Sequence, residues 1–187
     1  ELLVERLLGE AEPGGHAILK FNHLTDPILL DAIDACGRAG GRVDLIVRTT
    51  LPRISSSVHA RSIIGRFLEH ARAVAFRRGG AWEVWCSSSD AMPRNFDRRI
   101  ELMFPVEEPG ARELVLRELR AQVQDDVNAF DLSASGTETP RWGGVHDCQR
   151  MGARADRRTG AEDAAPEPLA PSRDAPGASP IGVSARA

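Results

Sequence analysis

The sequence lacks an excess of either charge and lacks a long apolar run. Its 187 residues hold 24 Lys and Arg against 27 Asp and Glu, a formal net charge of −3. No basic surplus therefore indicates nucleic acid, and no acidic surplus indicates a disordered chain. No apolar run approaches the roughly 18 residues of a membrane-spanning helix, and the first residues, ELLVERLLGEAE, are too acidic for a signal peptide.

Cysteine is scarce, and the common catalytic motifs are missing. Cys36, Cys86 and Cys148 show no CxxC spacing, which argues against a structural zinc site and a disulfide framework and favours a reducing cytoplasm. Neither HExxH nor any other ligand spacing among the histidines is present, so we predict no metal site built by this chain. The absence of GxxxxGK[ST], GxGxxG and GxSxG gives no support for a P-loop, a dinucleotide site or a serine nucleophile.

The amino-terminal part alternates between helix and strand patterns. Residues 16–22 (HAILKFN) predict a strand, and Asp26 then caps a helix that has Pro27 at its first position. Residues 43–48 (VDLIVR) predict the next strand. A strand–helix–strand unit of this length predicts a parallel pair of strands.

Strands predominate in the following part of the chain. After a turn-like stretch we expect strands at 58–64, 70–76, 82–87 and 99–106, a bend at 92–95 and an amphipathic helix over 109–130. From about residue 143, Ala, Pro, Gly, Arg and Asp dominate without periodicity. We therefore predict one domain over 1–142, an α/β fold with a mixed sheet flanked by helices, and a disordered tail over 143–187.

Two residues are candidates for phosphate chemistry. Arg48 ends a predicted parallel strand, where α/β sheets bind ligands, and its planar guanidinium suits a phosphate. His70 lies two residues before Arg72, so both would point the same way in a strand, and a histidine beside a cation can handle a proton. The residues alone leave another interpretation open for each, a surface arginine and a histidine held by a backbone carbonyl.

Five segments together resemble a known family. They are KFNHLTDP (20–27), VDLIVR (43–48), RSIIGRFLEHAR (61–72), SSSDAMPRNFDRRIELMFPVEEP (87–109) and DDVNAF (125–130). In order and direction they resemble the C-terminal catalytic domain of bacterial polyphosphate kinase, of the long ATP-dependent type. The resemblance covers roughly residues 1–142 and implies a phospholipase D-like half-domain. The resemblance implies that the complete enzyme consists of two such halves together with an N-terminal domain and a helical domain.

The resemblance also implies an activity and a site. The complete enzyme would transfer the terminal phosphate of ATP reversibly to inorganic polyphosphate, with Mg²⁺, through a phosphorylated histidine in the preceding half. His70, in FLEH, matches a second histidine that lies across the site, and Arg48 matches an arginine that contacts nucleotide phosphates. Arg72 and Asn95 would be neighbours of the site. The Mg²⁺ ligands would lie in the remaining domains, and the full enzyme would be a homo-oligomer.

Two departures from the family pattern are visible. The stretch 49–57 is shorter than the usual loop after the arginine, and Ala91 stands where the family usually has tryptophan. Because the phosphorylated histidine would lie in another domain, we expect this chain to be inactive alone. Two alternatives stay open: a phospholipase D-like phosphodiesterase half, for which Arg72 replaces the preferred lysine, and a non-catalytic remnant that binds phosphate or polyphosphate.

Overall fold

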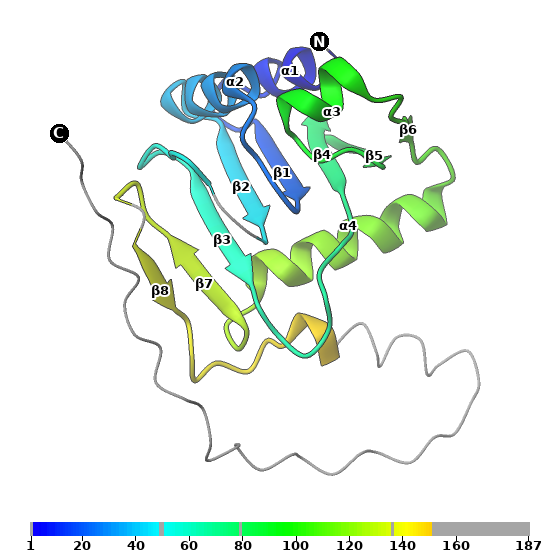
Figure 1. Cartoon of the computed structure of the whole chain (residues 1–187). Helices are drawn as coiled ribbons and strands as arrows, with labels where there is room; N and C mark the ends of the chain where they lie inside the picture. Colours follow the sequence, from blue (N-terminus) through cyan, green and yellow to red (C-terminus); the bar gives the residue numbers. More distant parts are fainter. Residues whose placement is uncertain (1, 49–50, 79, 136, 151–187) are drawn as a thin grey trace, which may run out of the picture.

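A computed structural model describes residues 2–48, 51–78, 80–135 and 137–150 (Figure 1). The helices and strands follow one another as α1 (Leu2–Leu8), β1 (His16–Phe21), α2 (Pro27–Arg38), β2 (Arg42–Val47), β3 (His59–Ile63), β4 (Ala73–Arg78), β5 (Ala81–Ser87), α3 (Pro93–Arg98), β6 (Met103–Pro105), α4 (Pro109–Gln124), β7 (Ala129–Leu132) and β8 (Glu138–Pro140). The predicted α/β class, a mixed sheet flanked by helices, is confirmed.

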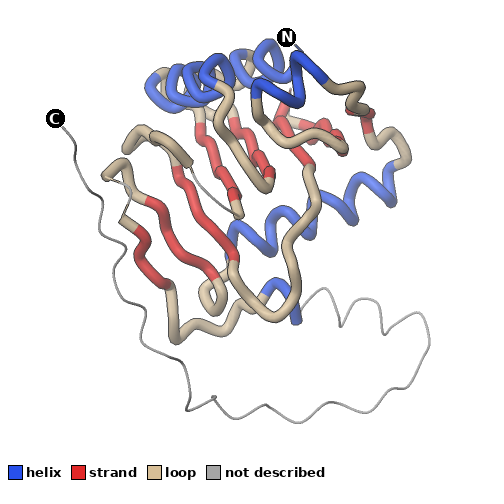
Figure 2. Tube along the Cα trace, viewed as in Figure 1, coloured by secondary structure: helices blue, strands red, loops and turns tan. Residues whose placement is uncertain are grey.

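All strands belong to one sheet, in the order β6-β5-β4-β1-β2-β3-β7-β8. The central strands β1, β2 and β3 are parallel neighbours, whereas the other neighbouring strands are antiparallel. The parallel pair predicted from the strand–helix–strand unit is β1 and β2, with α2 between them in the sequence. Figure 2 shows helices on both sides of this sheet.

The sheet separates two hydrophobic clusters. Leu29 of α2 packs in the cluster that includes Leu45, and Leu119 of α4 packs in the cluster that includes Ile46. Leu45 and Ile46 are consecutive in β2 and belong to different clusters because successive strand side chains point to opposite faces. Accordingly, α1, α2 and α3 lie on one side of the sheet and α4 on the other (Figure 1).

The sequence signals at both ends of α2 take their expected roles. The Asp26 carboxylate accepts a hydrogen bond from the Leu29 N–H at 2.8 Å, and Pro27 occupies the first helical position. After the helix, Gly40 has a φ of +94°, a left-handed conformation that glycine adopts without steric cost. These residues set the length of the connection between β1 and β2.

The predicted strand at 70–76 begins later than expected. Ala73 is the first residue of β4, where the chain starts to pair with both β1 and β5. The preceding residues, including His70 and Arg72, form a loop. The Arg72 carbonyl still accepts a backbone hydrogen bond from the Ser87 N–H, and the Arg72 guanidinium holds the loop through side-chain hydrogen bonds to Asp90.

Three other expectations are wrong in part. The bend predicted at 92–95 is the start of α3. Of the strand predicted at 99–106, Met103–Pro105 pairs with β5. The helix predicted to reach residue 130 ends at Gln124. Asp125 stops it, because its carboxylate accepts hydrogen bonds from the backbone N–H groups of residues 127 and 128 and turns the chain into β7. Strands β7 and β8 were not predicted.

The packed chain continues past residue 142, where the sequence predicts the end of the domain. Cys148 is buried in the α4-side cluster, and its N–H donates to the Asp125 carboxylate at 2.9 Å. Residues 143–150 therefore pack on the domain. Residues 151–187 lie outside the described residues, so a disordered tail there stays a prediction. Within the described ranges, no helix is both long and apolar enough to cross a membrane.

Candidate functional site

Several segments meet at one edge of the sheet. The parallel strands β1, β2 and β3 end there, and β5 also ends there because both β1 and β5 pair antiparallel with β4. Ligands of α/β sheets bind at the carboxyl ends of parallel strands. Asn22 follows β1 and Arg48 follows β2. The loop 64–72 connects β3 to β4, and the turn 87–90 lies at the end of β5.

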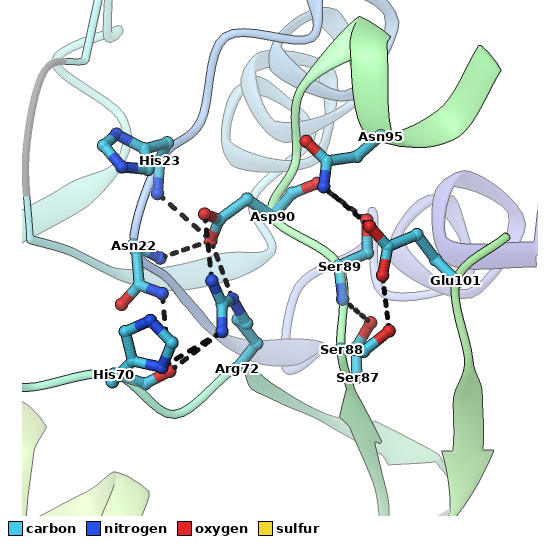
Figure 3. Close-up of polar contacts among 10 residues, drawn as sticks. All are labelled: Asn22, His23, His70, Arg72, Ser87, Ser88, Ser89, Asp90, Asn95 and Glu101. Carbon is cyan, nitrogen blue, oxygen red and sulfur yellow. Dashed lines mark hydrogen bonds and ion pairs between the residues drawn. The ribbon is translucent and has the colours of Figure 1, made fainter. Parts of the chain in front are cut away.

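The His70 side chain is exposed at this edge, in the loop between β3 and β4 (Figure 3). Its Nδ1 lies 3.3 Å from Nη1 of Arg72, and its backbone carbonyl accepts a hydrogen bond from the same guanidinium at 3.3 Å. The expected neighbourhood of His70 and Arg72 is therefore present, although neither residue is in a strand. An exposed imidazole beside a guanidinium can approach a phosphate and exchange a proton with it.

Arg72 is itself fixed by Asp90. Its Nε and Nη2 donate to the two Asp90 carboxylate oxygens at 3.0 and 3.2 Å, and the backbone N–H groups of Asn22 and His23 donate to the same carboxylate. Burial raises the pKa of Asp90, but the hydrogen bonds from Arg72 and the two N–H groups outweigh burial and hold the pKa below its usual value. Arg72 is thus oriented by Asp90, whose carboxylate compensates the charge of the guanidinium.

Asn22 links β1 to the loop that carries His70. Figure 3 draws the Asn22 amide with its Nδ2 toward the His70 carbonyl, but turning the amide over satisfies both of its ends. In that orientation its Oδ1 accepts from Arg72 Nη2 at 2.8 Å and its Nδ2 donates to the Glu69 carbonyl at 2.9 Å. Sequence reasoning missed both Asn22 and Asp90 as site residues. The available signal was their place within the segments KFNHLTDP and SSSDAMPRN, which begin in the last residues of β1 and β5 and continue into the following loops.

Arg48 follows β2 and lines a different part of the edge. It borders a cavity of about 270 Å³ together with Pro52, Ser62 and Glu138, and its carbonyl accepts a hydrogen bond from the Ser62 hydroxyl at 3.2 Å. Among the described residues, no ion pair engages the Arg48 guanidinium, and no hydrogen bond joins Arg48 to His70. The two predicted site residues therefore share an edge without touching.

Comparison with known proteins decides the family. The family profile described as polyphosphate kinase C-terminal domain 2 matches residues 3–148. This chain belongs to the polyphosphate kinase family. Polyphosphate kinase 1 of Chlorobaculum tepidum is 39% identical over 145 residues, which are 73% of this chain and 21% of that protein. The chain thus spans about a fifth of the length of this curated relative.

Solved structures agree with membership of the polyphosphate kinase family. The polyphosphate kinase from Porphyromonas gingivalis superposes with a TM-score of 0.74 at 28% identity, covering 84% of this chain and 26% of that chain. Nuc from Salmonella typhimurium, a phospholipase D family member, superposes with a TM-score of 0.53 at 12% identity, covering 70% of this chain and 88% of that chain. The second likeness concerns the fold alone and confirms the predicted phospholipase D-like half-domain.

Ala91, which the family resemblance places at a tryptophan position, is fully buried. Its N–H donates to the His23 carbonyl at 3.1 Å, and its own carbonyl accepts from the N–H groups of Thr25 and Asp26 at 2.9 and 3.0 Å. These bonds use only the backbone of residue 91. The turn after β5 therefore stays joined to the segment after β1 without the aromatic ring.

Asn95, the other neighbour that the polyphosphate kinase resemblance suggests, lies on the far side of Asp90 from His70 (Figure 3). It is buried in α3, and its Nδ2 donates to the Glu101 carboxylate at 2.8 Å. Glu101 also accepts a hydrogen bond from the Ser88 hydroxyl. In the described part of the chain, no hydrogen bond connects Asn95 to His70 or Arg72, so Asn95 supports the turn rather than the imidazole.

The described residues do not fit a magnesium site of their own. Over the described ranges, no group of three or more His, Cys, Asp or Glu side chains is arranged to hold a metal ion. Asp90, the carboxylate beside His70 and Arg72, already accepts hydrogen bonds from Arg72 and two backbone N–H groups.

Proposed function

We propose that this chain forms the phosphate-binding half of a polyphosphate kinase site, in which His70 and Arg48 act on ATP and polyphosphate. The observation that carries the proposal is the exposed His70 imidazole at the carboxyl edge of the sheet, held by Arg72 and, behind it, Asp90. Membership of the polyphosphate kinase family supports the reaction class.

Phosphoryl transfer requires in-line positioning and positive charge around the group that moves. The Arg48 guanidinium would hold non-bridging phosphate oxygens through two parallel charge-assisted hydrogen bonds. His70 would donate a proton to, or accept one from, the oxygen at which the phosphate bond forms or breaks. Such acid–base assistance is typically worth about 10²–10⁴ in rate. Arg72, which Asp90 already engages, would orient His70 rather than bind the phosphate.

The rest of the reaction would need other parts of the enzyme. The phosphorylated histidine and the magnesium ligands would lie in domains outside this chain. By itself, this chain would then bind phosphates but would not form polyphosphate. Family resemblance supports a homo-oligomeric enzyme, and the scattered cysteines support a cytoplasmic one. The phosphodiesterase alternative has only a likeness of fold in its favour.

A graft tests this function. Residues 2–150 would replace the matching domain of the Porphyromonas gingivalis polyphosphate kinase, and ATP-dependent polyphosphate synthesis would be measured. The graft should be active, and His70→Ala should lower its rate by about 10²–10⁴. Arg38→Ala is the matched control, because Arg38 lies on α2 with its side chain 64% exposed. An active graft that keeps its rate after His70→Ala would refute the assigned role, and an inactive graft would favour the non-catalytic remnant.

A further inference from the structure

A buried lysine lies beneath the loop that carries His70. Lys20 of β1 is 2% exposed, and its ammonium donates to Glu69 Oε2 and to Gln122 Oε1, each at 2.6 Å. A charged group is costly to bury unless it is paired and hydrogen-bonded. Among the described residues, the partners that Lys20 finds are Glu69, which is the residue directly before His70 in the loop, and Gln122 of α4.

Both carboxylate oxygens of Glu69 are engaged. Oε2 accepts from Lys20 and, at 3.3 Å, from Gln122 Nε2, whereas Oε1 accepts from Gln149 Nε2 at 2.9 Å. These three partners belong to β1, α4 and the segment after β8. Glu69 is therefore held from three directions, and its position fixes the backbone from which the His70 side chain projects.

Gln149 adds a second attachment to the same loop. Its Nε2 donates to the Phe67 carbonyl at 2.8 Å, and its Oε1 accepts from the Phe67 N–H at 2.9 Å. The segment that carries Gln149 is anchored in turn, because the N–H of Cys148 donates to Asp125. Figure 1 shows this short segment, near the end of the described chain, against the loop between β3 and β4.

Apolar packing does not explain how the loop is held. The side chains of Ile64, Phe67 and Leu68 are exposed, at 60%, 56% and 73% of their areas. Hydrophobic burial therefore contributes little to the position of these residues. Backbone hydrogen bonds hold the two ends of the loop, at Ile64 and Arg72, and between them the polar contacts of Glu69 and Gln149 constrain it.

We propose that Glu69 is a positioning residue that places His70, and that Lys20 and Gln149 act through it. This proposal rests on the proposed function of His70 as the group that meets phosphate. Lys20, Glu69 and Gln149 would touch neither phosphate nor nucleotide. They would raise the fraction of time that the imidazole spends where a phosphate can reach it, and the apparent affinity would rise with that fraction.

Two measurements on the full chain test the proposal. Amide exchange reports the order of residues 66–70, and calorimetric titration with polyphosphate reports binding. Lys20 and Gln149 donate to different oxygens of the Glu69 carboxylate. In Glu69→Gln only one acceptor oxygen remains, so one of these two donors loses its partner. We expect exchange at 66–70 to become on the order of tenfold faster and the affinity to fall about tenfold. Gln149→Ala should act in the same direction. Glu107→Gln and Gln124→Ala, at exposed positions, are the matched controls and should change neither.

A double variant separates positioning from general stabilisation. Lys20→Met with Glu69→Leu replaces the ion pair by apolar side chains of similar size, a change that is often neutral for stability. If Glu69 positions the loop, this variant keeps fast exchange at 66–70 and weak binding even when its unfolding temperature returns to that of the wild type. Recovery of slow exchange and wild-type affinity in the double variant would overturn the proposal.

The two hypotheses fail in different ways. If the wild-type chain does not bind polyphosphate, the proposed function is contradicted, and the exchange rates still decide whether Glu69 holds the loop. If the wild type binds but Glu69→Gln exchanges and binds like the wild type, positioning by Glu69 is contradicted and the proposed function stands.

Discussion

The two predicted site residues lie on one sheet edge but in different surroundings. His70 sits in a loop attached through Glu69, Asn22 and Arg72 to the strands and to α4. Arg48 borders an open cavity, and no described residue forms an ion pair with its guanidinium. An imidazole that exchanges a proton needs a fixed position, whereas a guanidinium that holds a flexible polyanion can adjust to it. Substitutions on the His70 side should therefore lower the free energy of unfolding. Substitution of Arg48 should mainly lower the affinity for polyphosphate.

The largest expected effect is on the His70 side, at Lys20. Lys20→Met leaves the Glu69 carboxylate in its present site without a counter-charge, where the Lys20 and Glu69 side chains are 3% and 16% exposed. Removing one partner of such a pair should lower the free energy of unfolding by about 3 kcal/mol, measured by urea denaturation. Arg117→Met, on the exposed face of α4, is the control. Equal stabilities of Lys20→Met and the wild type would show that the loop does not depend on this pair.

The next effect concerns Asp90, behind Arg72. Asp90→Asn removes the charge that Arg72 engages and should cost about 2 kcal/mol of unfolding free energy at pH 7. The folded-state pKa of Asp90 lies below its unfolded value, which is about 3.9. The stabilisation is therefore fully present above that value and is lost as the pH falls through the folded-state pKa.

The pH dependence supplies the test for Asp90. The difference in stability between the wild type and Asp90→Asn should be constant from pH 7 to about pH 5 and should shrink below about pH 4. Asp97→Asn, at an exposed position of α3, serves as the control and should show no such difference. A gap between wild type and Asp90→Asn that stays constant to pH 2 would mean that the Asp90 charge does not stabilise the fold.

On the Arg48 side, the effect should appear in binding. Arg48→Ala removes a guanidinium that no described ion pair uses, so the free energy of unfolding should change by less than about 0.5 kcal/mol. The loss of charge-assisted hydrogen bonds should weaken polyphosphate binding about tenfold, or roughly 1.4 kcal/mol, as measured by titration calorimetry. Arg48→Lys should recover part of the affinity because it keeps the charge but not the fork. Unchanged affinity in Arg48→Ala would remove Arg48 from the site.

The sequence predicted well where local signals and the fold agree. Asp26, Pro27 and the short, mostly apolar runs of β1 and β2 mark elements whose boundaries depend on residues close in the chain. It predicted poorly where distant contacts decide. The helix α4 stops at Asp125, whose carboxylate accepts hydrogen bonds from the next residues and also from the distant Cys148 N–H, and hydrophobic periodicity contains neither contact. Likewise, β4 starts at Ala73 because the preceding residues are bound to side chains of other elements.

The same distinction applies to the site. His70 and Arg48 could be proposed from the sequence. Arg48 ends a predicted parallel strand, and His70 lies in the FLEH motif two residues before Arg72. Glu69 and Lys20 could not be paired from the sequence, because 48 residues separate them and a buried lysine in a strand looks like any exposed one. Asp90 follows three serines in the sequence and has no distinguishing pattern. The fold shows that its carboxylate accepts hydrogen bonds from Arg72.

The smallest expected effect lies outside both sides of the edge. Asp26→Ala removes the N-cap of α2, where the carboxylate accepts the Leu29 N–H, and should cost about 1 kcal/mol of unfolding free energy. Since α2 packs on the face opposite α4, amide exchange at 66–70 and polyphosphate affinity should stay at wild-type values while the chain is folded. Asp26→Asn, which keeps an acceptor oxygen, should recover most of the stability. If Asp26→Ala weakened binding as much as Glu69→Gln, any loss of stability would disturb the site. The proposed difference between the anchored His70 side and the Arg48 side would then be contradicted.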